Sequence, residues 1–568
     1  MNNFDGFNKL KRTSCVVQLC PLMRENTVNG AQLIRRSLSH DISYRTRLQE
    51  LIFDLYRDEK TNKIFIPRFF KEWIDAGIRK DDPRLQEVIN KVSKRLKRAS
   101  SISFYLNTMI AIIILYVKDT MCVLLSRCVG NSIGVIGKAL KKQLVIPDWP
   151  SFTKVMGELY EECRRNDRGQ LARADPNSFA ISVCTVDGQR MSWGDALKPF
   201  CLQSVSKPFT YALVHDELGP DELHSHVGQE PSGRLFNDIC LDHNKKPHNP
   251  LINAGAIVVA SLMKRHASLS DRFDFAIHQM RRFSGAGYVG FNNAVFLSER
   301  ETADRNYALS YYMREHKVFP PDTSIQDTLD LYFQLCAIET NCDTLAVMAA
   351  TLANGGVNPM NSERVINNRA CRDTLSLMYS CGMYDWSGQF AFRIGLPAKS
   401  GVSGDMIMVI PNVMAIAIYS PRLDMLGNTY RGVRFAEAFI NKFNFHNYDS
   451  LVYSDCQKMD PRKVVPETEH DNTSRFMFAT KHGDISTIKR YLLLGIDIHD
   501  RDYDDRTVLH VAASEGDSTC LHYLLTKWKE SPEPRDRFGR TPLDDANYFG
   551  HKECVTVLQE FIDRWTEQ

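Results

Sequence analysis

The apolar residues of this chain follow different periods in different stretches, and each period predicts a secondary structure. The segment FAISVCTVDG alternates apolar and polar side chains and stops at Asp187-Gly188, which predicts a strand that enters a hairpin. Residues 406–421 contain two more strand-like runs on either side of a proline-asparagine pair. The helical stretch 328–356 lies between the strands and ends on two glycines, a common helix stop. This mixture predicts an α/β domain over residues 147–446.

Ahead of that domain, residues 45–146 place apolar side chains at helical spacing, which predicts a small EF-hand-like helical domain. Its segment RDEKTNK is similar to a calcium-binding loop but lacks the alternating acidic ligands and the closing glutamate, so we expect a solvated turn. Residues 102–117 are mostly apolar, with Asn107 among them. A helix of that length reaches about 24 Å, short of the ~30 Å hydrocarbon core, so we expect a buried helix, with a membrane span as the alternative.

The end of the chain repeats itself. Gly483, Gly516 and Gly550 are 33 and 34 residues apart, and the segments around them align with one another. This pattern resembles ankyrin repeats over residues 475–568, each a turn and two helices that must stack on a neighbour to bury an apolar face. The preceding residues 447–474 include a charged, proline-containing stretch and predict a linker.

Composition narrows the class of protein. The 568 residues suggest about two to four domains, and 43% hydrophobic with 24% charged residues is ordinary for a globular chain. A net charge of only +3 gives no basic surface for nucleic acid, and 15 cysteines without a CxxC pair predict reduced thiols rather than disulfides or zinc. Lys9, Lys11 and Arg12 suit a targeting segment over residues 1–44, although Asp5 and Glu25 dilute that pattern.

The candidate chemistry lies in serine and lysine residues three positions apart, a spacing that brings both side chains to one face of a helix. The chain has four such pairs, so spacing alone does not choose among them. Ser204/Lys207 is distinguished because it opens an apolar helical run after strand-like segments, where backbone N–H groups can stabilise an oxyanion. The other pairs, which we expect to be structural, are Ser151/Lys154, Ser261/Lys264 and Ser486/Lys489.

A lysine can act as a base only if its pKa falls from about 10.4 toward neutrality, which burial can cause. Phe200, Leu202, Pro208 and Phe209 supply apolar neighbours for Lys207. The segment Lys399-Ser400-Gly401, beside the strand-like run at 406, adds a second lysine that would lower the pKa of Lys207 further if it lay close. An SxxK pair at a helix start and a KSG segment beside a strand have the layout of the serine β-lactamase and transpeptidase fold.

The motifs around these residues are more specific than their spacing, and together they resemble the animal kidney/liver-type glutaminases from about residue 49 through the ankyrin tail. The motifs are VCTVDGQR, PFCLQSVSKPF, VGQEPSG, KPHNPLINAGAIVV, YVGFNNAVFLSERETADRN, LYFQLCAIE, MAATLANGG, SCGMYDWSGQFAF and GLPAKSGVSGD. The resemblance implies a β-lactamase-like catalytic domain that hydrolyses L-glutamine to L-glutamate and ammonia, with no metal and no organic cofactor.

The resemblance also assigns roles within the site. Ser204 would attack the side-chain amide of glutamine, Lys207 would accept its proton, and backbone N–H groups of Ser204 and Val402 would hold the oxyanion. Tyr384 could relay a proton to the leaving ammonia. Glu299 suits the α-ammonium of the substrate. The substrate-binding positions implied are Gln203, Ser204, Asn253, Glu299, Asn306, Tyr332, Tyr384 and Val402.

Beyond the site, the resemblance implies a mitochondrial homotetramer or filament that inorganic phosphate activates; a cytoplasmic location is the alternative. The activation loop of the family maps to 236–241, with Tyr312 nearby, and Asp238 stands where the family has a lysine. A further departure lies in 164–179, which is about seven residues shorter than in the family and lacks the tyrosine that lies over the active site there.

Three functional hypotheses follow. The first is an active glutaminase with a Ser-Lys dyad and an acyl-enzyme. The second, motivated by the absent tyrosine, is a catalytically weak relative that acts as an assembly partner or as a scaffold whose ankyrin repeats bind a protein. The third is a β-lactamase-like or peptidase hydrolase with the same SxxK layout.

Overall fold

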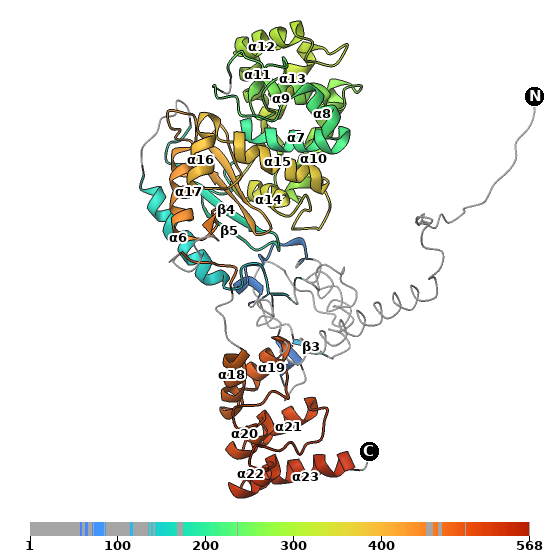
Figure 1. The fold of residues 1–568 in the computed structure, drawn as a ribbon, viewed down its shortest axis with the longest axis vertical. Helices are drawn as coiled ribbons and strands as arrows, with labels where there is room; N and C mark the ends of the chain where they lie inside the picture. Colours follow the sequence, from blue (N-terminus) through green and yellow to red (C-terminus); the bar gives the residue numbers. More distant parts are fainter. Residues whose placement is uncertain are drawn as a thin grey trace, which may run out of the picture.

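The computed structural model describes most of the chain from residue 143 onward and short segments before it (Figure 1). The described residues are 57–58, 63–65, 71, 73–84, 86, 114–116, 135, 138–139, 143–166, 174–235, 237–449, 458–463, 469–494 and 496–566.

A five-stranded antiparallel sheet with the strand order β5-β4-β11-β10-β9 organises the α/β domain. The strands are β4 (Ala180–Thr185), β5 (Arg190–Gly194), β9 (Ala398–Ser400), β10 (Asp405–Ile410) and β11 (Met414–Tyr419). The predicted hairpin at Asp187-Gly188 and the two predicted strands within 406–421 are confirmed. Gly188, with φ of 84°, lies in the β4–β5 turn, and Asn412, with φ of 62°, lies between β10 and β11.

Alternate residues of the central strands face two different cores, so the sheet is buried on both faces. Met406 and Met408 pack with α6 (Trp149–Arg164) and α17 (Tyr430–Lys442), whereas Ile407 and Val409 pack against the helices of the opposite face. Figure 1 shows α6 and α17 on one side of the sheet and α14 on the other. Successive side chains of a strand point to opposite faces of the sheet. Because both faces are buried, β10 and β11 read as nearly continuous apolar runs in the sequence.

The second face of the sheet carries a helical region that positions most of the candidate site. Its elements are η2 (Gln203–Val205), α7 (Ser206–Leu218), α8 (Pro220–His226), α9 (Asn253–Leu262), α10 (Leu269–Ser284), α11 (Asn293–Glu301), α12 (Asp304–Glu315), α13 (Ile325–Cys336), α14 (Cys342–Ala353) and α15 (Asn368–Cys381). A small antiparallel sheet, β6-β8-β7, joins them through β6 (Phe200–Cys201), β7 (Gly290–Phe291) and β8 (Ile338–Thr340). After α15, η3 (Tyr384–Trp386) leads into α16 (Ser387–Arg393), whose Phe390 packs in the core of α6 and α17.

The predicted helical stretch 328–356 is therefore not one helix. It ends on Gly355 and Gly356 as predicted, with φ of 62° and 85°, but β8 separates α13 from α14. Residues of β8 pair with both β6 and β7, and this tertiary pairing overrides the local helical pattern.

The described residues of the predicted EF-hand-like domain include short strands as well as helical residues. The short strands β1 (Arg57–Asp58), β2 (Lys63–Phe65) and β3 (Ile114–Tyr116) form an antiparallel sheet. The predicted helix over 102–117 is thus wrong at 114–116, where an Ile-Leu-Tyr segment suits strand pairing; the remainder of that stretch lies outside the described residues. In the part of the chain that the structure describes, no helix has the length and apolar character needed to cross a bilayer.

The C-terminal part consists of three helix pairs with a shared core, as the repeat pattern predicts. The helices are α18 (Glu469–Lys481), α19 (Ile485–Leu494), α20 (Val508–Glu515), α21 (Ser518–Lys527), α22 (Pro542–Tyr548) and α23 (Lys552–Thr566). The three repeat glycines all have positive φ at the turns between paired helices. The first helix begins at Glu469, within the predicted linker.

Candidate functional site

Ser204 lies in the short 3₁₀ turn η2, immediately ahead of α7. Leu202, the residue before η2, is held in place because its N–H donates to the Ile338 carbonyl of β8 at 2.8 Å. Gln203 adopts a left-handed backbone with φ of 45°, which costs a non-glycine residue about 1–2 kcal/mol. The Ser206 hydroxyl donates to the Gln203 carbonyl at 2.7 Å and holds this turn closed. The fold thus presents Ser204 on a strained, supported turn at the start of a helix.

Lys207 lies one helical turn beyond Ser204 and is 1% exposed. Its Nζ donates to the Asn253 Oδ1 at 2.7 Å, at the first residue of α9. Burial lowers the pKa of Lys207 to about 8, while the charge of Glu299 acts in the opposite direction. A lysine with that pKa is substantially neutral in mildly alkaline solution and can accept a proton.

Further polar contacts join four of the other predicted positions in two pairs, Asn253 with Asn306 and Gln203 with Glu299. The Asn253 amide nitrogen donates to the Asn306 Oδ1 at 3.2 Å. On the other side of Ser204, the Gln203 Nε2 donates to the Glu299 Oε1 at 3.2 Å. The structure therefore gathers residues from η2, α9, α11 and α12 that lie more than 100 residues apart in sequence.

Tyr384 opens η3 and also has a left-handed backbone, with φ of 50°. Burial raises the pKa of Tyr384 above its usual value, while the nearby Ser204 side chain acts in the opposite direction, so the hydroxyl stays protonated near neutral pH. The Nζ of Lys399 lies 4.3 Å from the centre of the Tyr384 ring. Tyr384 thus lies near both Ser204 and the second lysine.

Lys399 is fully buried on β9 and donates to the Ser400 carbonyl at 2.6 Å. The fold brings it close enough to Lys207 for the two charges to interact. Burial and the charge of Lys207 lower the pKa of Lys399 well below its usual value, and burial lowers the pKa of Lys207. Two buried amines this close disfavour carrying charge at the same time.

Tyr332 on α13 lies beside Cys336, a residue that was not predicted from the sequence to belong to the site. One helical turn later, the Cys336 thiol lies close enough to Tyr332 and to Lys207 to influence their pKa values. Burial raises the pKa of Cys336 to about 12, so the thiol is neutral. The i, i+4 spacing within LYFQLC was the available signal, because it puts the thiol on the face of Tyr332.

Val402 lies on the tight turn between β9 and β10 and is 37% exposed. The turn lies against the segment that carries Ser204, since a Cβ on Gly401 would come 3.1 Å from the Leu202 carbonyl and 2.1 Å from the Asp405 Oδ1. Asp405 is fully buried and accepts a hydrogen bond from the Ser403 hydroxyl at 2.6 Å. Burial raises the pKa of Asp405 to about 7.

A cavity of about 160 Å³ opens beside Tyr384. Residues 231–234, 249, 251 and 252 line it together with the end of α15, η3 and the start of α16. Its size suits one small substrate group, while the tyrosine hydroxyl itself is buried.

The other predicted positions fall elsewhere. Ser151/Lys154 lie on α6, Ser486 and Lys489 lie on α19, and Lys264 follows the end of α9. In the activation loop, residue 236 lies outside the described residues, and Tyr312 stacks edge-on against His316 on α12. Of the shortened segment 164–179, residues 167–173 also lie outside them.

Three family models and several named relatives match this chain. The family model described as Glutaminase matches residues 166–448, an EF-hand domain matches 48–147, and ankyrin repeats match 476–564. A Caenorhabditis elegans protein named "Putative glutaminase 3" is 66% identical over 98% of this chain and 95% of its own length. The chain belongs to the glutaminase family.

More distant relatives agree. The mitochondrial liver isoform of rat glutaminase is 42% identical over 91% of this chain and 85% of its own. A glutaminase of the cyanobacterium Nostoc is also 42% identical, over 52% of this chain and 90% of its own. The crystal structure of the "Probable Glutaminase" of Bacillus subtilis is 32% identical over 51% of this chain and 95% of its own, with a TM-score of 0.48. The predicted family, the enzyme class of glutamine amidohydrolase and the α/β fold class with ankyrin repeats are confirmed.

Proposed function

We propose that the protein hydrolyses L-glutamine to L-glutamate and ammonia through an acyl-enzyme on Ser204, with Lys207 as the base. The observation that carries this proposal is the burial of Lys207 one turn from Ser204 in a chain of the glutaminase family. With a pKa of about 8, Lys207 can take the serine proton at the start of the reaction and return it later.

The proposed reaction proceeds in two steps. The Ser204 oxygen attacks the side-chain carbonyl of glutamine while its proton passes to Lys207, and the N–H groups of Ser204 and Val402 face the developing oxyanion. Collapse of the tetrahedral intermediate breaks the C–N bond, and the nitrogen leaves as ammonia with a proton relayed through Tyr384. Water then attacks the ester, releases glutamate and restores the Ser204 hydroxyl.

The substrate roles follow from charge and hydrogen-bonding capacity. Glu299 is the acidic member of the predicted set and would pair with the α-ammonium of glutamine, and Gln203 holds its carboxylate in place. Asn253, Asn306 and Tyr332 would hydrogen-bond the amino and carboxylate groups. The Cys336 thiol would position the Tyr332 hydroxyl.

Ammonia release from L-glutamine by the purified full chain tests the proposal. We expect Ser204→Ala to lower kcat at least about 1,000-fold, because the nucleophile is lost. Ser151→Ala is the matched control, since it removes the serine of another SxxK pair on α6, and it should retain the wild-type rate. Equal rates for wild type and Ser204→Ala would refute the dyad and favour the alternative of a weak relative that serves as a scaffold.

The assembly, the location and the regulation are proposals as well. The rat and mouse relatives are named mitochondrial, which supports a mitochondrial location for this chain. We propose a homotetramer without a metal or organic cofactor, activated by phosphate, and with ankyrin repeats that bind a protein. Sedimentation, cell fractionation and rates measured with and without phosphate would test these points.

A further inference from the structure

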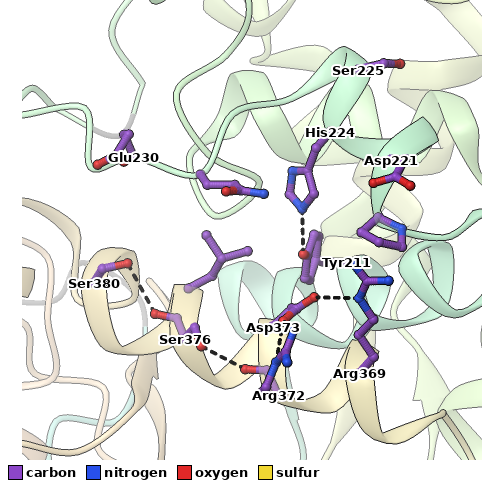
Figure 2. A pocket seen from close by; sticks show the side chains of 13 residues that line it. Tyr211, Asp221, His224, Ser225, Glu230, Arg369, Arg372, Asp373, Ser376 and Ser380 are labelled. Atoms are coloured by element: carbon purple, nitrogen blue, oxygen red, sulfur yellow. Dashed lines mark hydrogen bonds and ion pairs between the residues drawn. The ribbon is translucent and has the colours of Figure 1, made fainter.

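A larger cavity, distinct from the one beside Tyr384, opens between α7, α8 and α15 (Figure 2). Its volume is about 680 Å³, within the range of about 300–1,000 Å³ that is typical of small-molecule sites. The residues proposed to take part in the reaction do not line it. The cavity therefore has to be explained by its own side chains.

Two side chains form an uncharged part of its wall. The His224 ring contacts the Val227 carbonyl through Nδ1 at 3.0 Å and the Tyr211 hydroxyl through Nε2 at 3.0 Å. Because a carbonyl can only accept, Nδ1 carries the proton and Nε2 accepts from the tyrosine. Burial lowers the pKa of His224, in keeping with a neutral ring. The charge of the cavity therefore comes from its other lining residues.

One face of α15 supplies cationic groups. The side chains of Arg369 and Arg372 are 60% and 68% exposed. The Asp373 carboxylate pairs with the Arg372 Nη2 at 2.7 Å and with the Nε2 of the buried His215 at 2.9 Å. The Arg369 Nε lies 4.0 Å from the Asp373 Oδ2. Among the described residues, no hydrogen bond is formed by the terminal nitrogens of Arg369. That guanidinium fork is available to a carboxylate.

The rest of the lining accepts hydrogen bonds. The Ser376 hydroxyl donates to the Arg372 carbonyl at 3.0 Å, and the Ser380 hydroxyl donates to the Ser376 carbonyl at 3.2 Å. Their protons are used within the helix, so their oxygens remain as acceptors. Asp221 on α8 and Glu230 after it add two exposed carboxylates, and Figure 2 shows Glu230 across the cavity from α15.

We propose that this cavity binds a small zwitterionic ligand, an α-amino acid, apart from the catalytic site. The ligand carboxylate pairs with Arg369 and Arg372, and its ammonium group pairs with Asp221, whereas Glu230 lies on the opposite side of the cavity (Figure 2). A ligand with negative charge alone would meet those two carboxylates without a compensating cation. Mixed charges around one cavity thus select an amphoteric molecule.

The position of the cavity couples it to the proposed reaction. Helix α7 begins two residues after Ser204, carries Lys207, and reaches the cavity at Tyr211. Helix α15 lines the cavity and ends three residues before Tyr384. Ser380 lines both cavities. A ligand that bridges these helices touches the elements that place the nucleophile and the tyrosine.

Calorimetric titration of the full-length Ser204→Ala chain with L-glutamate tests the inference. We expect two sites per chain, of which Arg369→Ala/Arg372→Ala removes one or weakens it at least about 10-fold. Both arginines are largely exposed, so this variant should keep the wild-type melting temperature. Arg281→Ala, on the exposed face of α10, is the matched control and should leave both sites intact.

Glutarate, which lacks the ammonium group, and inorganic phosphate serve as comparison ligands. We expect each to bind the cavity at least about 10-fold more weakly than L-glutamate. Equal binding of phosphate or glutarate, or a second glutamate site that survives Arg369→Ala/Arg372→Ala, would overturn the assignment. If the proposed catalytic function were wrong instead, Ser204→Ala would show a single glutamate site that is still sensitive to the arginine variant.

Discussion

The contact between Asn253 and Lys207 allows a direct test of the proposed base. In Asn253→Asp, a carboxylate replaces the amide 2.7 Å from the lysine Nζ. Two unit charges at that distance attract by about 6 kcal/mol at an effective dielectric constant of about 20, and desolvation of the new carboxylate offsets part of this. Opposite charges at such contacts raise a lysine pKa by roughly 1 to 3. The pKa of Lys207 should therefore move from about 8 to between about 9 and 11.

The assay is the pH dependence of kcat/KM for ammonia release, which reports the pKa values of the free enzyme. Lys207 must be neutral to accept a proton, so activity rises with pH through about 8 in the wild type. The rise should shift to higher pH in Asn253→Asp. It should shift below 8 in Asn253→Ala, which loses an acceptor that stabilises the ammonium. A rise that stays near pH 8 in both variants would refute Lys207 as the base, whatever happens to KM.

Three further predictions concern other parts of the chain. Tyr384→Phe should lower kcat about 100-fold or more, as measured by ammonia release, because a proton donor is lost; an unchanged kcat would exclude the relay. Gly401→Ala should lower the free energy of unfolding by about 1–3 kcal/mol in urea titrations, because its Cβ meets Asp405, whereas Gly388→Ala, with open space, should not. A chain truncated to residues 143–463 should keep glutaminase activity, as Nostoc glutaminase matches about half of this chain; an inactive but folded truncation would contradict this.

The sequence was most informative where a local pattern and the tertiary fold agree. Alternation in FAISVCTVDG and the pair of apolar runs at 406–421 identified the central strands, although the alternation did not reveal that β4 is buried on both faces. The repeat of glycines identified the ankyrin helices because each repeat is a local unit with its own turn. Strand β8 escaped prediction because its pairing partners are remote in sequence.

The site was less predictable, because the pKa values of its side chains depend on how deeply the fold buries them. The SxxK spacing occurs four times, and family motifs rather than spacing distinguished Ser204/Lys207. That Lys207 and Lys399 are both buried and close enough for their charges to interact could be seen only in the fold. The Cys336 thiol and the buried Asp405 became visible only once the packing was known.

The left-handed backbones of Gln203 and Tyr384 have a consequence for how the enzyme responds to heat. Both residues adjoin Ser204, and each stores roughly 1–3 kcal/mol that local opening releases. The doubly buried strands β10 and β11 carry no such strain in their interiors, since the positive φ of Asn412 is confined to their turn. Amide hydrogens near residues 203 and 384 should therefore exchange with deuterium before those of the sheet. On heating, catalysis should be lost several degrees below the temperature at which the sheet melts.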